Sequence, residues 1–178
     1  MHAHHHTALV VVAALVLSGC GSEPTGTLST PSSHVALATN AQQRITGDCK
    51  ITSVVALGVQ EGVLTQFSTA DCRLTHLGRT ASSMVQRVDL ATLVARAEVV
   101  WTTASGDVVR ATSVGQGTAT GPGTVAFTGT VTIGGGTGRF ANASGTLAVS
   151  GTADNVNGTG SSRYDGWVDY DASDRGRR

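Results

Sequence analysis

Charged and aromatic side chains are scarce in this sequence of 178 residues, of which 13% are charged and 4% are aromatic. Lys and Arg together number 12, as do Asp and Glu, so the formal net charge is zero. Without surplus positive charge, the chain lacks the electrostatic surface to which nucleic acids and anionic membranes bind. We therefore expect no nucleic-acid partner and no membrane binding by charge.

A helical hydrophobic period is also missing beyond the N-terminal segment, and proline and cysteine occur only three times each. Glycine is abundant instead, at 23 residues, together with Val, Thr and Ala. This composition favours many short strands joined by tight turns over helices. The length suits one domain that can bury a core of its own.

The longest apolar run, Ala8 to Leu17, is too short for a transmembrane helix, which needs about 20 residues. Its length suits the hydrophobic region of a signal peptide. The segment Leu17-Ser18-Gly19-Cys20 follows directly. It resembles the lipobox of bacterial lipoproteins, whose cysteine receives diacylglycerol and becomes the first residue of the mature chain. We predict a lipoprotein signal peptide over residues 1–19 and a lipid on Cys20.

This prediction places the protein at the cell membrane, lipid-anchored and facing outside the cytoplasm. The residues before the apolar run depart from the usual pattern, because His2 and His4 to His6 stand where Lys or Arg is typical. These histidines could also be interpreted as a metal tract, but they lie in the segment that would be cleaved. An ordinary cleaved signal or a simple anchor helix is the alternative to lipidation.

The rest of the chain divides into three parts. Residues 20–44 are rich in Ser, Thr, Gly, Ala and Pro without a hydrophobic period, and we predict a flexible tether there. Residues 45–171 carry repeated strand patterns and form the predicted β-barrel domain. Residues 172–178 are polar, and we expect them to be disordered.

The clearest strand pattern surrounds Phe127, where apolar residues alternate strictly with Thr and Ala. Such alternation is typical of a strand with one buried face. Similar patterns predict about eight strands, near residues 47–59, 63–69, 80–88, 93–103, 108–119, 123–133, 144–152 and 159–170. The third of these is the weakest, because Ser82 and Ser83 disturb its alternation.

Eight antiparallel strands joined by short turns can close into a barrel or pack as a two-sheet β-sandwich. Closure removes the exposed edge strands that invite aggregation. We predict an all-β fold with an antiparallel eight-stranded closed barrel, and keep the sandwich as the alternative. A barrel of this size is just wide enough to be filled by side chains or to hold one small ligand.

Two segments resemble a known family. His76-Leu77-Gly78-Arg79, and the later Ile133 to Ala141 followed by Ala143-Ser144-Gly145, are similar to signatures of bacterial secreted proteins with an allene-oxide-cyclase-like barrel. The resemblance spans roughly residues 45 to 171 and implies a calycin-type, eight-stranded barrel. Most bacterial members have no established activity. The plant cyclases use a glutamate and a polar water-holding group inside the barrel, and no motif here matches either.

The glycine-rich segment after Ile133 is predicted to be a structural turn comprising Gly134, Gly135, Gly136, Gly138, Arg139 and Phe140. Gly136-x-Gly138-x-x-Ala141 also fits the dinucleotide fingerprint. That fingerprint needs a helix behind it to receive the pyrophosphate, whereas another strand pattern follows here. We expect Phe140 to cover the apolar end of the barrel and Arg139 to bond carbonyl groups.

With Cys20 lipidated, Cys49 and Cys72 remain, and two cysteines in an exported domain are best interpreted as one disulfide. In the chain-entropy model this disulfide would contribute roughly 3 kcal/mol. A catalytic pair of Cys72 and His76 is the alternative. Four residues along a strand separate such groups by roughly 13 Å, so only a sharp turn could bring them together.

No catalytic or metal-binding set can be assembled from the rest. His76 is the only histidine outside the signal and tether, and no Gly-x-Ser-x-Gly elbow occurs. Glu98 would be a candidate base if it faced inward, but an outward ion pair with Arg96 or Arg110 is the simpler interpretation. The aspartates of residues 165–174 lack the spacing of an EF-hand loop. We expect no catalytic residue, no metal and no cofactor.

These observations favour a lipid-anchored barrel outside the cytoplasm that binds a hydrophobic small molecule or associates with the envelope. The alternatives are a barrel enzyme with isomerase or cyclase chemistry, by analogy of fold alone, and a structural or adhesive domain with a filled core. The barrel interior separates them, since a cavity with a few convergent polar groups favours binding or catalysis. The oligomeric state stays open.

Overall fold

The computed structural model describes residues 42–170. The predicted signal peptide, Cys20, most of the tether and the tail lie outside these residues. Eight strands and one turn of 3-10 helix follow in order: β1 (Gln43–Gln60), β2 (Val63–Leu74), β3 (Gly78–Asp89), β4 (Val94–Thr103), β5 (Val108–Gly121), β6 (Thr124–Gly136), η1 (Gly138–Phe140), β7 (Ser144–Asp154) and β8 (Thr159–Asp169). No helix within 42–170 is long and apolar enough to cross a membrane.

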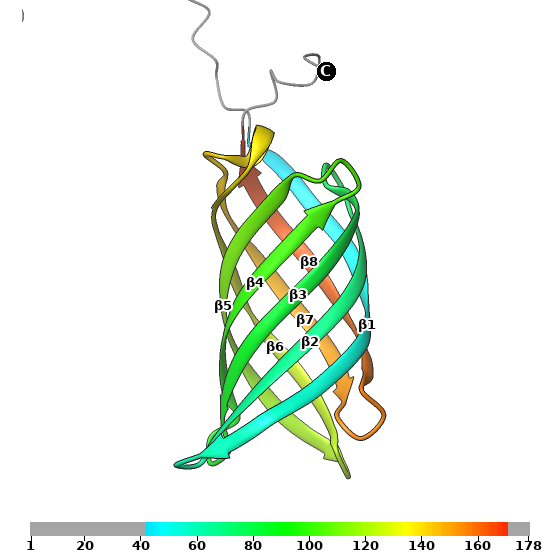
Figure 1. Ribbon diagram of the computed structural model, residues 1–178, viewed down its shortest axis with the longest axis vertical. Helices are drawn as coiled ribbons and strands as arrows, with labels where there is room; N and C mark the ends of the chain where they lie inside the picture. Colours follow the sequence, from blue (N-terminus) through cyan, green and yellow to red (C-terminus); the bar gives the residue numbers. More distant parts are fainter. Residues whose placement is uncertain (1–41, 171–178) are drawn as a thin grey trace, which may run out of the picture. The chain divides into compact units, whose positions relative to one another are not determined.

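The strands form a closed antiparallel barrel (Figure 1). Each strand pairs with the next along the chain, and β8 returns to pair with β1 from Ile51↔Gly160 to Gln43↔Val168. The predicted eight-stranded barrel is therefore confirmed, and the two-sheet sandwich is excluded. Closure gives every strand of this sheet a paired neighbour on each side.

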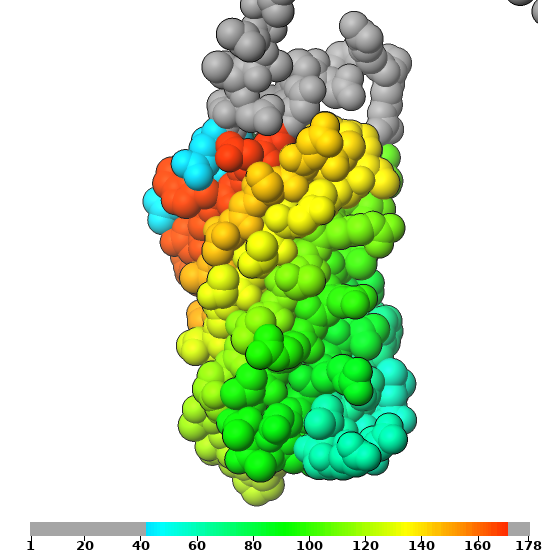
Figure 2. Space-filling model, turned by 90° about the vertical axis from the view of Figure 1, so that its left-hand side faces the viewer, coloured from blue at the N-terminus to red at the C-terminus, as the bar shows by residue number. Residues whose placement is uncertain are grey.

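Alternation of side chains determines which face of each strand is buried. On β4, Ala97, Val99 and Trp101 are buried in the interior, whereas Arg96 and Glu98, at the alternate positions, are exposed. The exposed residues form the outer wall, where Figure 2 shows successive strands as oblique bands of side chains. The strand pattern of the sequence therefore predicts inside and outside correctly along β4.

The glycine-rich segment differs from the predicted simple turn. β6 continues to Gly136, and its pairing with β5 shifts between Val109↔Gly136 and Ala111↔Ile133. Gly134 and Gly135 lie in this irregular stretch, which has the character of a β-bulge. Only then does the chain turn through η1 into β7. The glycines thus end a bulged strand as well as turn the chain.

The two ends of the barrel differ (Figure 1). One end, here called the cap end, carries η1, the start of β1 and the end of β8. The opposite end, here called the mouth, carries the turns β1–β2, β3–β4, β5–β6 and β7–β8. The largest fully buried side chains include Trp101, Tyr170 and Phe140. Because Phe140 belongs to η1 and Tyr170 follows β8, this packed core lies toward the cap end.

Two covalent or ionic links join β1 to its neighbours. Cys49 and Cys72 are directly opposed on β1 and β2, with Cα atoms 4.0 Å apart, and form a disulfide as the sequence predicted. Across the β1–β8 seam, the Arg44 guanidinium donates to both carboxylate oxygens of Asp165, at 3.1 and 2.9 Å. Both partners of this ion pair are more than half exposed, so it stabilises the seam modestly.

Gly136→Ala is expected to destabilise the barrel, and Gly134→Ala serves as its matched control. A Cβ at Gly136 would collide with the backbone carbonyl of Val108, whereas a Cβ at Gly134 would meet no atom within 4 Å. We expect a loss of about 1–3 kcal/mol for the first and less than about 0.5 kcal/mol for the second. Thermal unfolding measures both. If the segment bound a nucleotide instead, millimolar NAD or ATP would stabilise the wild type and Gly136→Ala would abolish that effect.

Candidate ligand-binding cavity

Aromatic rings close the cap end. Phe140 is completely buried, and its ring lies 5.0 Å from that of Tyr170. Below them, Trp101 is completely buried and packs edge-on against Tyr164, with ring centroids 5.5 Å apart. These contacts pack the interior of the barrel from the cap to about the level of Tyr164.

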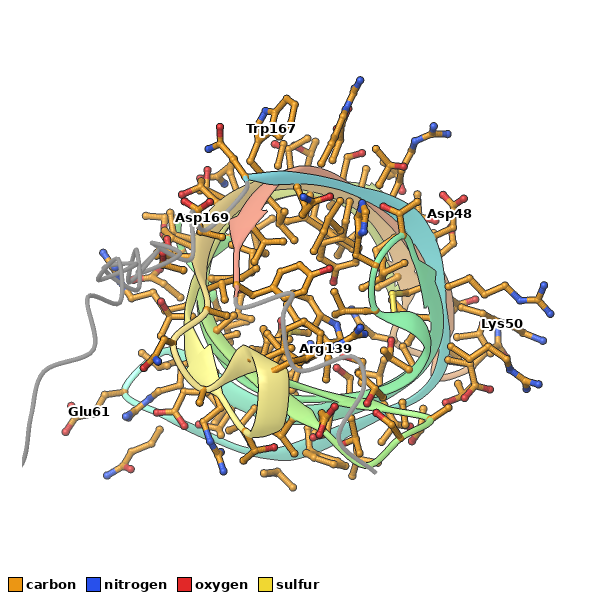
Figure 3. All side chains as sticks on the ribbon, turned by 90° about the horizontal axis from the view of Figure 1, so that it is seen from above. Asp48, Lys50, Glu61, Arg139, Trp167 and Asp169 are labelled. Carbon is orange, nitrogen blue, oxygen red and sulfur yellow. A yellow bond between two sulfur atoms is a disulfide. The ribbon has the colours of Figure 1, made fainter. Side chains whose placement is uncertain are left out.

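Arg139 lies over this aromatic cluster, inside the outline of the barrel in Figure 3. Its guanidinium carbon is 4.7 Å from the centre of the Phe140 ring and 5.6 Å from that of Tyr170. Its Nη2 donates to the backbone carbonyl of His76 at 2.7 Å. Arg139 thereby joins η1 to the β2–β3 turn, while Asp48 and Lys50 point away from the barrel (Figure 3).

The other half of the interior is hollow. It holds a cavity of about 260 Å³ that extends from Tyr164 to the turns of the mouth, where Leu90, Leu93 and Asn155 line it. Small inward residues leave this space. Gly115 and Gly129, which are directly opposed on β5 and β6, place no side chain inside the barrel.

One wall of the cavity is polar. Its polar side chains come from the inward positions of β2 and β3 and are Gln66, Ser68, Ser82 and Gln86, which are interspersed with the apolar side chains of Leu64, Ala70, Met84 and Val88. Gln66, Ser68 and Ser82 are each at most 8% exposed. None of these four side chains has a hydrogen-bond partner within residues 42–170.

The facing wall is apolar. In a closed barrel of eight strands, β6 and β7 lie across from β2 and β3. Their side chains that line the cavity from inward positions are Val125, Phe127, Val131, Val149 and Ala153. One side of the cavity therefore offers hydrogen-bonding side chains, and the opposite side is apolar. No Asp, Glu, Lys, Arg or His lines the cavity.

Tyr164 forms the floor of the cavity and is its one titratable lining group with a displaced pKa. Burial raises the pKa of the Tyr164 phenol above its ordinary value of 10.0, and a hydrogen bond with Ser162 acts in the opposite direction. The phenol therefore stays neutral at ordinary pH and can donate a hydrogen bond toward the cavity.

The mouth is bordered by exposed apolar side chains, two near the end of β1 and one in the β7–β8 turn. Leu57, Val59 and Val156 are 61%, 61% and 75% exposed. In the β3–β4 turn, the Asp89 carboxylate accepts hydrogen bonds from the Thr92 and Ala91 amides. Hydrogen bonds, first from Thr92 and then from Ala91, lower the pKa of Asp89. Asp154 accepts similarly from Val156 and Asn157 in the β7–β8 turn.

No protein-family model matches this sequence, and no curated protein sequence matches it. Among solved structures, that of a pterocarpan synthase dirigent protein is similar, with a TM-score of 0.52 and 14% sequence identity. The two chains share a barrel fold. The similarity covers 73% of this chain and 96% of that one. At so low an identity, it carries no information about a ligand or reaction.

The residues that sequence reasoning singled out lie away from the cavity. Phe140 and Arg139 are at the cap, and Cys72 is bonded to Cys49, so it cannot act as a nucleophile with His76. His76 is exposed in the β2–β3 turn with a φ of 66°. None of these residues lines the cavity.

The interpretation of Glu98 was half right. It is exposed on β4, as expected, but the residues opposite it are Val85 and Thr112. The predicted ion pair with Arg96 or Arg110 is therefore wrong, and Glu98 forms no salt bridge in the described part of the chain.

No group of three or more His, Cys, Asp or Glu within 42–170 could hold a metal ion.

Stability should fall at alkaline pH because of Tyr164. Its pKa is raised in the folded state, so its contribution is complete below the unfolded value near 10 and is lost as the pH rises through the folded value. We expect the midpoint of thermal unfolding to drop more steeply above about pH 10 in the wild type than in Tyr164→Phe. Parallel pH profiles from 8 to 11, if superimposable, would contradict the burial of this phenol.

Proposed function

We propose that this protein binds a small, uncharged, largely apolar molecule in the mouth half of its barrel. The observation that supports this most is the cavity of about 260 Å³ with one polar and one apolar wall. A barrel with a filled interior would have large side chains at the positions that line the cavity, whereas on β4 and β5 this barrel has Ala95 and Gly115 at opposed lining positions. Ligand sites commonly combine an apolar lining with a few convergent polar groups.

The lining supports binding over catalysis. General acid–base chemistry needs groups that gain or lose protons near neutral pH. The cavity is lined by no carboxylate, imidazole, thiol or amine, and the pKa of the Tyr164 phenol is raised further from neutrality. An isomerase or cyclase acting in this cavity would have only neutral amides, hydroxyls and one phenol to work with.

The size of the cavity limits its ligand. A buried apolar cavity of about 150 Å³ is known to hold benzene, so 260 Å³ suits a molecule of roughly two fused rings. The exposed apolar border at the mouth would offer such a molecule a first contact before it enters. The likeness of residues 76–79 and 133–145 to allene-oxide-cyclase-like barrels is compatible with this proposal, as is the dirigent-protein fold.

We propose further that the barrel works outside the cytoplasm, attached to the membrane through lipid on Cys20. The apolar run and the lipobox-like sequence before Cys20 support this. If it is right, Cys20→Ser should abolish partitioning of the protein into the detergent phase. Unchanged partitioning of the variant would contradict the anchor and leave the cavity proposal untouched.

Indole, a neutral bicyclic compound, tests the binding function. A ligand at 100 times its dissociation constant stabilises a fold by about 2.7 kcal/mol, so indole should raise the midpoint of thermal unfolding. Ala95→Phe, whose ring would occupy the space beside Gly115, should fold but respond much less. The proposal fails if indole has no effect on the wild type, or if it affects both proteins equally.

A further inference from the structure

The polar wall has a defined arrangement in depth. From the mouth inward, the opposed pairs on β2 and β3 are Leu64↔Val88, Gln66↔Gln86, Ser68↔Met84 and Ala70↔Ser82. Directly opposed residues of an antiparallel pair have Cβ atoms about 5 Å apart. The side chains of Gln66 and Gln86 therefore lie side by side, and they are the next inward pair after Leu64 and Val88, counted from the mouth.

These two carboxamides are unsatisfied by the protein. Each has two N–H donors and one carbonyl acceptor, yet neither has a hydrogen-bond partner within residues 42–170. Gln66 is only 6% exposed. Both side chains line the cavity, so their donors and acceptors face its interior and can form hydrogen bonds with a molecule bound there. A bound molecule is the natural source of these bonds.

The lack of charged side chains in the cavity lining favours an uncharged ligand. No cationic side chain lines the cavity to compensate a carboxylate or phosphate, and no anionic side chain lines it to compensate an amine. Burial of an unpaired ion is strongly unfavourable. The group that fits two neighbouring carboxamides is therefore neutral, and it must both donate and accept.

We propose that Gln66 and Gln86 select a ligand with an adjacent neutral donor and acceptor, of which the –NH–CO– edge of a lactam is the simplest example. The ring system of this ligand lies against the apolar wall of β6 and β7, with Phe127 and Val131 across the cavity. This inference rests on the proposed binding function, and it identifies the residues that determine specificity.

Three bicyclic probes of similar size separate the effects of apolar contact, hydrogen bonding and charge on affinity. They are naphthalene with no polar group, 2-quinolone with a lactam edge, and 2-naphthoate with a carboxylate. Equilibrium dialysis of the full chain gives the three dissociation constants. Two hydrogen bonds of ordinary net strength, each worth about fivefold, should make 2-quinolone bind about 25-fold tighter than naphthalene. We expect 2-naphthoate to bind more weakly than either.

Gln66→Leu and Gln86→Leu test the residues independently. Each should weaken 2-quinolone binding about fivefold and leave naphthalene binding unchanged or slightly tighter. Gln60→Leu is the matched control, because Gln60 is exposed at the end of β1, and it should change neither constant. A circular dichroism melt of each variant establishes that it is folded.

The outcomes are distinct. If naphthalene binds as tightly as 2-quinolone, or if both glutamine variants keep wild-type affinity for 2-quinolone, the selection by Gln66 and Gln86 is refuted while the cavity remains a binding site. Tightest binding by 2-naphthoate would also refute it. If none of the three probes binds, the proposed binding function itself is refuted.

Discussion

Phe140→Ala is expected to lower the free energy of unfolding by about 3–5 kcal/mol, the range for a fully buried ring. Phe140 has no exposed surface and contacts the Tyr170 ring at 5.0 Å and the Arg139 guanidinium at 4.7 Å. Removing it leaves a void beneath η1 and takes away the surface on which Arg139 lies. Chemical denaturation at constant pH measures the loss.

Phe127→Ala is the control for this prediction. Phe127 is only partly buried and already lines the cavity, so its removal enlarges an existing space and forfeits fewer contacts. We expect less than half the effect of Phe140→Ala on stability. Equal losses from the two substitutions would mean that the cap core contributes no more to stability than the cavity wall does.

Loss of the disulfide is expected to have the next largest effect, about 3 kcal/mol in the chain-entropy model. Cys49 and Cys72 are 23 residues apart in sequence and opposed on β1 and β2. The link constrains the unfolded chain, and β1 is also the strand that must pair with β8 to close the barrel. The paired substitution Cys49→Ser with Cys72→Ser avoids a free thiol.

Reduction of the wild type should reproduce the unfolding midpoint of that double variant. In the unreduced native protein, neither thiol should react with an alkylating agent. Rapid labelling of Cys49 and Cys72 before reduction would show that the disulfide is absent in solution. An effect of reduction on the double variant would point to Cys20 instead.

Much of the barrel follows from local patterns in the sequence. Strict alternation around Phe127 and Trp101 predicts β6 and β4 with the correct buried face, because a strand has a fixed period of two. The strand ends are less predictable, and β6 runs on to Gly136 because a bulge keeps its last residues paired with β5. Closure depends on β1 meeting β8, more than 100 residues later, and no local pattern contains that information.

The sequence did not reveal the candidate site, because a polar residue that faces the cavity reads in the sequence as a break in the strand pattern. Ser82 weakens the strand pattern of β3, since a polar residue stands where a core residue is expected. In the structure Ser82 faces inward and belongs to the polar wall with Gln66 and Gln86. Polar residues at inward positions of two neighbouring strands are therefore the signal that could have located the cavity.

At the cap end, by contrast, a sequence motif identified residues that do not line the cavity. Arg139 and Phe140 were singled out by their place after a glycine-rich segment, and they are the residues that cover the barrel end. A motif of this kind identifies where the chain packs tightly. It carries little information about ligands, because the ligand-facing half of the barrel is built from ordinary strand residues that belong to no motif.

We expect a small molecule to enter the interior of the barrel from the mouth. Titration of the ¹⁵N-labelled protein with indole, followed through its backbone amide resonances, tests this most directly. Entry from the mouth should produce saturable shifts at inward positions on β2, β3 and β6, around Gln66, Gln86 and Phe127, and leave the cap residues near Phe140 unaffected. Shifts confined to outward-facing residues, or no saturable shifts at all, would contradict it.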